Sequence, residues 1–199
     1  PLFIVEYGDM EKIRFALIGY GSFGRSLVKY LFGIPRAELV AVYDDNGSYL
    51  QDVTRSLARD LDGGIKTFTS LEKLIDWGGF DAVMICSANY QHRDQAIMAA
   101  EAGKHIFCEK PMAITTSDCW DMVEAAEKDD VKLMVGHKRR LRPPWAKMAA
   151  LAKSGELGDP LAVNVTQYHW YPEFPGWWLK KDLCGGIYHR AGVHDIDFM

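Results

Sequence analysis

The sequence predicts an α/β protein in which a doubly wound, mainly parallel sheet is followed by the start of a second, mainly antiparallel domain. Strand-like apolar runs alternate with helical patterns through the first two thirds of the chain, and a glycine-rich turn joins the first strand to the first helix. After Gly136 a basic loop, one helix and an alternating segment replace this order. Repeated βα units favour parallel strands covered by helices on both faces. We therefore expect a first domain over residues 1–136 and a second over 137–199.

Six apolar runs in the first domain have the length and composition of buried strands. They span residues 13–18, 39–43, 66–68, 82–86, 105–108 and 132–135. Helical patterns follow the glycine turn and cover residues 71–76, 91–102 and 115–128. Gly33 and Pro35 end the first helix, Gly103 ends the third, and Thr116 or Ser117 is expected to cap the fourth.

The second domain begins with a helix, because Pro143 and Pro144 suit a first helical turn that continues to residue 153. Residues 161–168 alternate like a strand with one wet face. A helical pattern after Gly185 and Gly186 runs to residue 199 without a cap. Since one helix and one strand cannot close a core, we expect the chain to continue. The aromatic loop between them forms core or interface, or walls an active site; it contains Tyr168, Trp170, Tyr171, Phe174, Trp177 and Trp178.

Composition narrows the class of protein. The 199 residues are 48% hydrophobic and 25% charged, with a net charge of −4, so nothing draws the whole chain to nucleic acid or an anionic membrane. No apolar stretch approaches a membrane span, and the acidic residues within 1–12 exclude a signal peptide. Cys86 and Cys108 lie in apolar runs and are expected to be core thiols, which fits a reducing cytoplasm.

The turn Gly19-Tyr20-Gly21-Ser22-Phe23-Gly24 is the most informative motif, because it lies between a strand and a helix. In a dinucleotide site the first glycine allows the tight turn, the second lets the backbone approach a pyrophosphate, and the third lets helix and strand pack closely. The helix directs its free N–H groups at the phosphates. Asp44 ends the next strand, roughly 20 residues on, where a carboxylate accepts hydrogen bonds from the ribose hydroxyls.

Two further clusters carry candidate chemistry. Glu109-Lys110-Pro111 follows the fifth strand, at the sheet edge where open α/β sheets bind ligands, so Lys110 can polarise a substrate hydroxyl or carbonyl. In the last helix Arg190, His194 and Asp197 share one face by their spacing. His194 could accept a proton there, with Asp195 or Asp197 fixing its tautomer, or it could be satisfied by a cap or salt bridge.

Two weaker interpretations stay open. Cys184, His189, His194 and Asp195 are close in sequence, but their spacing matches no standard zinc pattern, and we expect no metal. The densest basic cluster is a solvated loop or a local anion site near cofactor or substrate. It contains Lys138, Arg139, Arg140 and Arg142.

From residue 13 to the last residue the chain resembles the Gfo/Idh/MocA oxidoreductases. The resemblance rests on the glycine turn, Asn89 and His92, Glu109-Lys110-Pro111, and Gly192-Val193-His194-Asp195-Ile196-Asp197, with Trp177-Trp178 and Gly185-Gly186 before it. It implies a Rossmann domain, an open antiparallel sheet domain that often forms homo-oligomers, and NAD(P)-dependent chemistry on a sugar, polyol or related carbonyl. It places the catalytic lysine at Lys110 and the catalytic histidine at His194. The expected cofactor residues are Gly19, Gly21, Ser22, Phe23, Gly24, Asp44, Ser87, Asn89, His92, Glu109 and Lys110.

The chain departs from this family at residue 190. An aspartate is common four residues before the histidine, and this chain has Arg190. Three outcomes follow: His194 acts alone as base, Arg190 binds an anionic substrate group, or dehydrogenase activity is lost and a dinucleotide-sensing protein remains. We expect Arg190, Asp197 and Trp177 to contact the substrate. Asp44 favours NAD over NADP, because its carboxylate repels a 2′-phosphate.

Overall fold

The structure is a computed structural model that describes residues 11–57, 64–168, 173 and 175–199. Its centre is a six-stranded sheet in the order β3-β2-β1-β4-β5-β6, and every neighbouring pair is parallel. The strands are β1 (Ile13–Ile18), β2 (Ala37–Tyr43), β3 (Lys66–Phe68), β4 (Ala82–Ile85), β5 (His105–Cys108) and β6 (Leu133–Val135). This order confirms the predicted doubly wound α/β fold, with the switch in strand order between β1 and β4.

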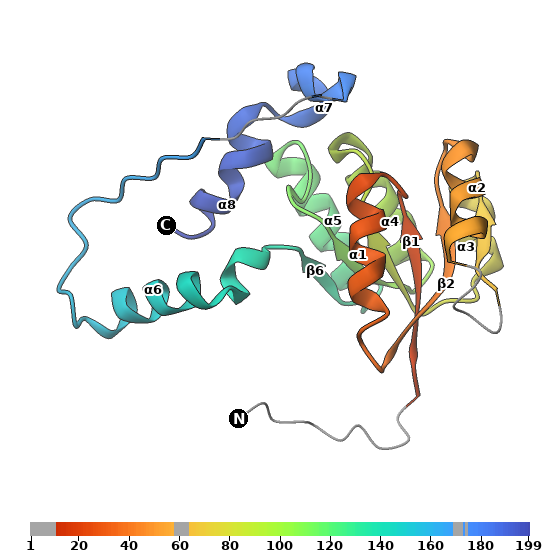
Figure 1. Cartoon of the computed structure of the whole chain (residues 1–199), viewed down its shortest axis with the longest axis horizontal. Helices are drawn as coiled ribbons and strands as arrows, with labels where there is room; N and C mark the ends of the chain where they lie inside the picture. The colour runs from red at the N-terminus through yellow and green to blue at the C-terminus, as the bar shows by residue number, and fades with distance from the viewer. Residues whose placement is uncertain (1–10, 58–63, 169–172, 174) are drawn as a thin grey trace.

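Helices cover both faces of the sheet (Figure 1). On one face α1 (Ser22–Leu31) and α2 (Gly47–Ser56) enclose a core that includes Leu17, Val42 and Met84. On the other, α3 (Leu71–Trp77), α4 (His92–Glu101) and α5 (Thr116–Lys128) enclose a second core with Ile18, Val83 and Ile85. Because successive strand residues point to opposite faces, the apolar end of β1 after Arg14 and the apolar run of β4 supply both cores.

Side-chain caps fix where several helices begin. Asn46 accepts from the backbone N–H of Ser48 before α2, and Ser70 accepts from that of Lys73 before α3. Before α5 the cap is Thr115, whose hydroxyl accepts from the backbone N–H of Asp118 while the Asp118 carboxylate accepts from the Thr115 N–H. The prediction of Thr116 or Ser117 as cap was therefore wrong. Only Thr115 has aspartate at the third helical position to complete this reciprocal pair.

The part after β6 lies beside the sheet rather than in it. Helix α6 (Pro143–Ser154) begins at the predicted prolines and ends at Gly155, which is left-handed, and it reaches away from the sheet (Figure 1). The chain then returns, so that α7 (Lys181–Cys184) and α8 (Val193–Ile196) lie near the carboxyl ends of the strands. The last helix expected from the sequence is formed without a break over residues 187–196, but it includes a π-helical turn, Tyr188–Gly192, that leads directly into α8, and it ends before residue 199.

The expected strand over 161–168 is not formed. These residues have no regular secondary structure, and Leu161 and Val163 are exposed. They pair with neither edge strand of the described sheet, β3 or β6, and a strand is stable only when it is paired. The open antiparallel sheet therefore stays a prediction, as do the domain limits 1–136 and 137–199. Of the aromatic loop, Trp170, Tyr171 and Phe174 lie outside the described residues.

Two sequence expectations about the chain as a whole can be compared with the structure. Cys86, Cys108, Cys119 and Cys184 are all free thiols; Cys108 is buried in the core as expected, whereas Cys86 is only half-buried. No helix among the described residues has the length and apolar character needed to cross a membrane.

Candidate active site

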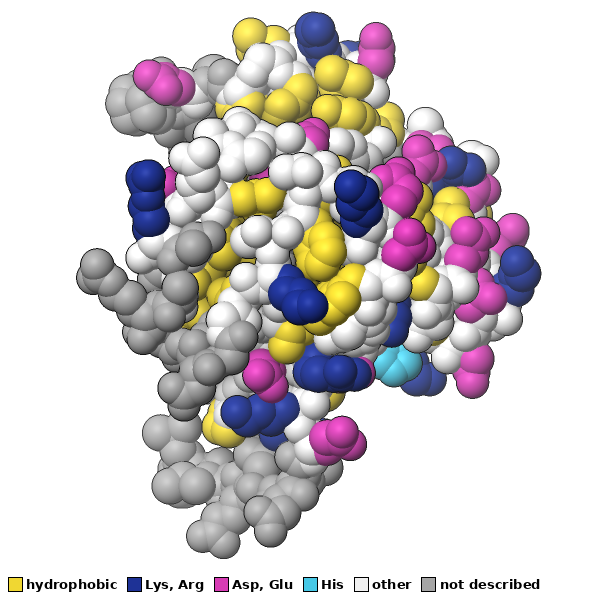
Figure 2. All heavy atoms as spheres, turned by 90° about the vertical axis from the view of Figure 1, so that its right-hand side faces the viewer, with side chains coloured by type: hydrophobic (Ala, Val, Ile, Leu, Met, Phe, Trp, Pro, Cys, Tyr) yellow, Lys and Arg dark blue, Asp and Glu magenta, His cyan; other side chains and the backbone are white. Residues whose placement is uncertain are grey.

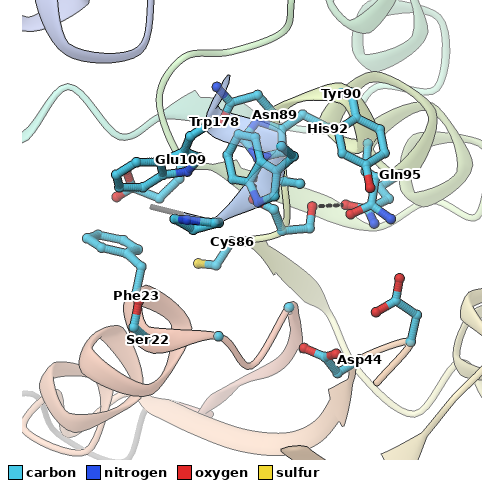
Figure 3. A pocket seen from close by; sticks show the side chains of 18 of the residues that line it. Ser22, Phe23, Asp44, Cys86, Asn89, Tyr90, His92, Gln95, Glu109 and Trp178 are labelled. Carbon is cyan, nitrogen blue, oxygen red and sulfur yellow. Dashed lines mark hydrogen bonds between the residues drawn. The ribbon is translucent and has the colours of Figure 1, made fainter. Parts of the chain in front are cut away.

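A cavity of about 530 Å³ lies along the carboxyl ends of β1, β2, β4 and β5. The glycine turn and Asp44 line one side, and the loops after β4 and β5 line the other, together with Trp177, Trp178 and Arg190 from the C-terminal segment. Figure 3 shows Ser22, Phe23 and Asp44 facing Asn89, Tyr90 and Trp178 across this space. The cavity is therefore formed by elements from both parts of the chain.

The glycine turn has the geometry that its sequence predicts. Gly19 has φ +94°, and a Cβ there would lie 2.7 Å from the backbone nitrogen of Ser87. A Cβ on Gly24 would lie 2.1 Å from the carbonyl oxygen of Gly19, so only glycine lets α1 approach β1 this closely. Gly21 has nothing within 4 Å of such a position, and no side chain caps α1. The first N–H groups of α1 are thus open to an anion in the cavity.

Asp44 is 7% exposed and holds the end of β2 against the glycine turn. Its Oδ2 accepts from the backbone N–H of Tyr20 at 2.7 Å, and its Oδ1 accepts from that of Asn46 at 2.9 Å. Burial raises the pKa of this carboxyl above its ordinary value, and the two backbone hydrogen bonds oppose that rise. Each oxygen keeps a second lone pair that a ribose hydroxyl can use.

The loop after β4 is held from several sides. His92 Nδ1 lies 2.9 Å from the carbonyl oxygen of Pro111, and Nε2 lies 3.2 Å from that of Ser87. Burial lowers the pKa of this imidazole, and a neutral ring can donate to only one of the two carbonyls. The Asn89 amide donates to the carbonyl of Cys184 at 3.3 Å. These side chains line the cavity and also connect the loops around it.

Lys110 lines the cavity from the loop after β5, opposite the glycine turn. Its Nζ donates to the backbone carbonyl of Arg190 at 2.9 Å. Burial lowers the pKa of Lys110, with smaller contributions from Lys138, Arg190 and Arg139, and the neighbouring Glu109 raises it. Glu109 is itself buried, and burial raises its pKa. A partly desolvated ammonium beside a carboxylate is suited to hold a polar oxygen of a bound molecule.

Arg190 lies at the same end of the cavity, with its guanidinium carbon 4.0 Å from the centre of the Trp178 ring. Trp178 packs edge-on against Trp177, whose ring in turn meets Tyr90. Hydrophobic side chains gather at the top of the molecule, over the 3₁₀ turn Gly176–Leu179 and α7, as Figure 2 shows. The C-terminal segment thus closes the Lys110 end with an aromatic wall and a cation.

His194 and Asp197 do not line the cavity. The Asp197 carboxylate binds Arg140 and lies 3.4 Å from His137 Nδ1, shortly after β6. His194 is 9% exposed, and its Nδ1 has no hydrogen-bond partner among the described residues. The expected hydrogen bond from His194 Nδ1 to Asp195 or Asp197 is therefore not formed, and both carboxylates pair with arginines instead.

Burial, together with the nearby cations Lys110, Arg139 and Lys138, lowers the pKa of His194 to about 4. The ring is therefore neutral at neutral pH and within electrostatic range of Lys110.

The basic cluster after β6 connects this part of the chain to the last helix through ion pairs. Arg139 pairs with Asp195, Arg140 pairs with Asp197, and the Lys138 ammonium lies 4.5 Å from the centre of the Phe23 ring. The solvated-loop interpretation thus misses two ion pairs that hold the last helix against the end of β6. In the part of the chain that the structure describes, no three His, Cys, Asp or Glu side chains are arranged to hold a metal ion.

Most residues expected at the site meet at the cavity. They are Gly19, Gly21, Ser22, Phe23, Asp44, Ser87, Asn89, His92, Glu109, Lys110, Trp177 and Arg190. Gly24 acts from behind it, through packing.

Several lining residues were missed from the sequence, namely Tyr49, Cys86, Tyr90 and Gln95. Trp178 belongs to the aromatic loop, and its place in the lining fits the interpretation that this loop walls the cavity. For Tyr49 a signal existed, since Asn46 caps a helix whose Leu50 and Val53 recur at helical spacing. The Gln95 side chain accepts a hydrogen bond from the Ser87 hydroxyl at 2.5 Å (Figure 3). No sequence pattern predicts this contact.

Two family descriptions match the chain. Residues 13–137 match the Gfo/Idh/MocA oxidoreductase family with an NAD-binding Rossmann fold, and residues 145–199 match the Gfo/Idh/MocA C-terminal domain. The 2,7-anhydro-N-acetylneuraminate hydratase of Escherichia coli (strain K12) is 31% identical over 93% of this chain and 48% of its own length. The 1,5-anhydro-D-fructose reductase of Ensifer adhaerens is 32% identical over 92% of this chain and 54% of its own.

A solved structure gives the same result. The WlbA dehydrogenase of Bordetella pertussis, in complex with NADH and UDP-GlcNAcA, is 30% identical with a TM-score of 0.69, over 74% of this chain and 41% of that one. The chain spans about half the length of the curated relatives that it matches. The glycine turn, the parallel sheet and both matched segments agree, and the chain belongs to the Gfo/Idh/MocA family of NAD-binding oxidoreductases.

Proposed function

We propose that this protein is an NAD-dependent oxidoreductase that transfers a hydride between nicotinamide and a secondary alcohol or carbonyl carbon of a sugar, inositol or related polyol. The observation that carries the proposal is the continuity of the cavity. One space of about 530 Å³ joins an open helix N-terminus and Asp44 at one side to Lys110, Trp177 and Arg190 at the other. A dinucleotide needs the first set, and a polar substrate with a reacting oxygen needs the second.

The residues present fit the dinucleotide. The open space at Gly21 and the uncapped start of α1 suit the pyrophosphate, and Asp44 suits the adenosine ribose. Bound NAD would supply the redox chemistry of the reaction. We propose NAD over NADP, because Asp44 and Asp45 both line that end and carboxylates repel a 2′-phosphate.

Two side chains are proposed to act on the reacting oxygen of the substrate, one by polarising it and one by accepting its proton. Lys110 lines the cavity and would hold and polarise that oxygen, which favours its negative charge during oxidation of the alcohol. His194 does not line the cavity, but its ring is neutral at neutral pH, so we propose that it accepts the released proton through a bridging water. Asp197 has no part in this proposal beyond holding α8, given its bond to Arg140. The homo-oligomer implied by the family resemblance stays a prediction.

The test is an assay of the full-length protein with NAD and NADP across sugars, inositols and sugar acids, together with measurement of NADH binding. Because one relative is named a hydratase, the sugar is followed by NMR as well as the nicotinamide by absorbance. Turnover of any of these compounds supports the proposal. Tight NADH binding without conversion favours a dinucleotide-sensing protein, and absence of NADH binding overturns both.

A further inference from the structure

We propose that the ring of Tyr49 stacks on the adenine of the bound dinucleotide, and that Arg25 holds this ring in place from outside the cavity. The inference rests on the function proposed above, because it assigns a further binding residue to the same cofactor. It depends on where Tyr49 lies relative to Asp44, on what fixes its ring, and on which other rings line the cavity.

Tyr49 lies at the end of the cavity where the adenine is expected. Asp44 suits the adenosine ribose, and the adenine is bonded directly to that ribose, so the base lies next to this carboxylate. Tyr49 lines the cavity, as do Asp44 and Asp45. The backbone N–H of Asn46 donates to Asp44 Oδ1 at 2.9 Å, and the backbone N–H of Tyr49 donates to the Asn46 carbonyl at 3.0 Å. Tyr49 is thus fixed close to the residue that receives the ribose.

The ring of Tyr49 is held by Arg25 of α1. The guanidinium carbon of Arg25 lies 5.2 Å from the centre of the Tyr49 ring and 5.0 Å from that of the Tyr20 ring, and such cation–π contacts are attractive. Arg25 is fixed in turn, because its Nε donates to the Tyr20 carbonyl at 3.2 Å and its Nη2 donates to the Asp52 carboxylate at 3.0 Å. One side chain therefore connects the glycine turn to α2.

This contact does not occupy the space that a dinucleotide would fill. Tyr49 lines the cavity and is 38% exposed, whereas Arg25 is not among the residues that line it. Aromatic rings stack on nucleic-acid bases, and a ring that is already held in place loses less entropy when the base arrives. Tyr49 therefore has both the position and the support needed to stack on the adenine.

The other aromatic rings of the cavity are engaged elsewhere. Tyr43 packs against the core that α3, α4 and α5 cover, and the Phe23 ring lies under a lysine ammonium. Tyr90 meets Trp177 edge-on and belongs to the aromatic wall. In the part of the chain that the structure describes, this leaves Tyr49 as the aromatic side chain at the ribose end of the cavity.

The experiment is calorimetric titration of the full-length protein with NADH, ADP-ribose and reduced nicotinamide mononucleotide. The first two ligands contain the adenosine, and the third lacks it. We expect Tyr49→Ser to weaken the binding of NADH and of ADP-ribose by about 10-fold each, since stacking of a base on an aromatic ring reaches this size. The affinity for the mononucleotide should not change. Tyr49→Phe should bind all three ligands like the unaltered protein, because it keeps the ring.

Arg25→Met tests the support of the ring. It should weaken the binding of NADH and ADP-ribose in the unaltered background, and it should have a smaller effect in Tyr49→Ser, where there is no ring to hold. Tyr30→Ser is the matched control, since Tyr30 is an exposed tyrosine of α1 that does not line this cavity. It should leave all three affinities unchanged.

Three results overturn the proposal: unchanged NADH and ADP-ribose affinity in Tyr49→Ser, an equal loss for the mononucleotide, or a loss in Tyr49→Phe as large as in Tyr49→Ser. An Arg25→Met effect of equal size in both backgrounds overturns the part assigned to Arg25. If the unaltered protein binds neither NADH nor ADP-ribose, the proposed function fails and the inference fails with it. If the unaltered protein binds both and Tyr49→Ser binds them equally well, only the inference fails.

Discussion

The Lys110 ammonium donates a 2.9 Å hydrogen bond to the backbone carbonyl of Arg190, 80 residues further along the chain. This bond joins the loop after β5 to the C-terminal segment, and it keeps a partly desolvated cation at the edge of the cavity. Lys110 can therefore serve the proposed chemistry only if it gives up or shares this bond when a substrate oxygen arrives.

Replacement of Lys110 tests that role. In Lys110→Met we expect turnover to fall about 100-fold or more, because general acid–base and electrostatic contributions of one side chain reach this size. The NADH affinity should change little. Steady-state kinetics with NADH titration measures both. Lys73→Met, at an exposed position of α3, is the control and should be neutral. A Lys110→Met enzyme with the wild-type rate would remove the assigned role.

The pKa of His194 predicts how the rate depends on pH. Because the pKa of His194 is lowered to about 4, its ring stays neutral down to acidic pH. The acid-side limb of the kcat/KM profile, where protonation of the base lowers the rate, should therefore lie near pH 4 rather than near 6.5. His194→Gln should lower the rate and remove that limb. A pH–rate profile from pH 3.5 to 8 measures it. A limb unchanged in His194→Gln would show that another group is the base.

The same shift predicts how stability depends on pH. In the unfolded chain a histidine binds a proton near pH 6.5, whereas folded His194 binds one only near pH 4. Between these values the unfolded state holds more protons, so the free energy of unfolding should fall as the pH drops from 6.5 to 4 and then level off. Urea unfolding at several pH values tests this. His194→Gln should reduce the fall, and an equally steep fall in that variant contradicts the explanation.

Two glycines of the turn should separate stability from binding. In Gly24→Ala the new Cβ would meet the Gly19 carbonyl at 2.1 Å, and overpacking of this kind costs about 1–3 kcal/mol of stability. In Gly21→Ala the Cβ meets nothing within 4 Å, so stability should stay within about 0.5 kcal/mol while NADH binding weakens. Thermal unfolding and NADH titration measure the pair. Equal loss of stability in both would mean that the turn is packed differently.

Asp44 should control the choice of cofactor. Asp44→Asn removes the negative charge and turns one oxygen into a donor facing a backbone N–H, so NADH should bind about 10-fold more weakly and the preference over NADPH should shrink. Affinities for both cofactors measure this. Asp45→Asn, one residue further and exposed, should have a smaller effect. Tighter binding of NADPH than of NADH by the unaltered protein would contradict the assignment.

Local signals were enough to predict the sheet. The runs that became β1, β3 and β5 were assigned with the bounds observed, because short apolar segments between breakers have few other ways to bury their side chains. Helix α2 was missed although Asn46 marks its start. Residues 161–168 show the opposite error, since alternation predicts a strand but a strand needs a partner, and these residues pair with no described strand.

The site was harder to predict where it depends on contacts between distant residues. Spacing predicted that Arg190, His194 and Asp197 lie on one helix. It could not show that Arg140 donates hydrogen bonds to Asp197, or that the Arg190 guanidinium lies over the Trp178 ring. Each of these pairs joins segments whose meeting depends on how the chain returns after α6. The glycine turn and Lys110, by contrast, follow strands directly, so the sheet alone determines their place.

The attachment of the C-terminal segment has a consequence for how the specificity of this protein could evolve. Asn89 and Lys110 donate hydrogen bonds to the main-chain carbonyls of Cys184 and Arg190, respectively. A main-chain carbonyl is present whatever side chain the residue carries. Position 190 can therefore be exchanged for residues of other charge without losing this attachment. A single substitution at position 190 could thus change the proposed substrate preference, because the main-chain hydrogen bonds that hold the C-terminal segment do not depend on the side chain there.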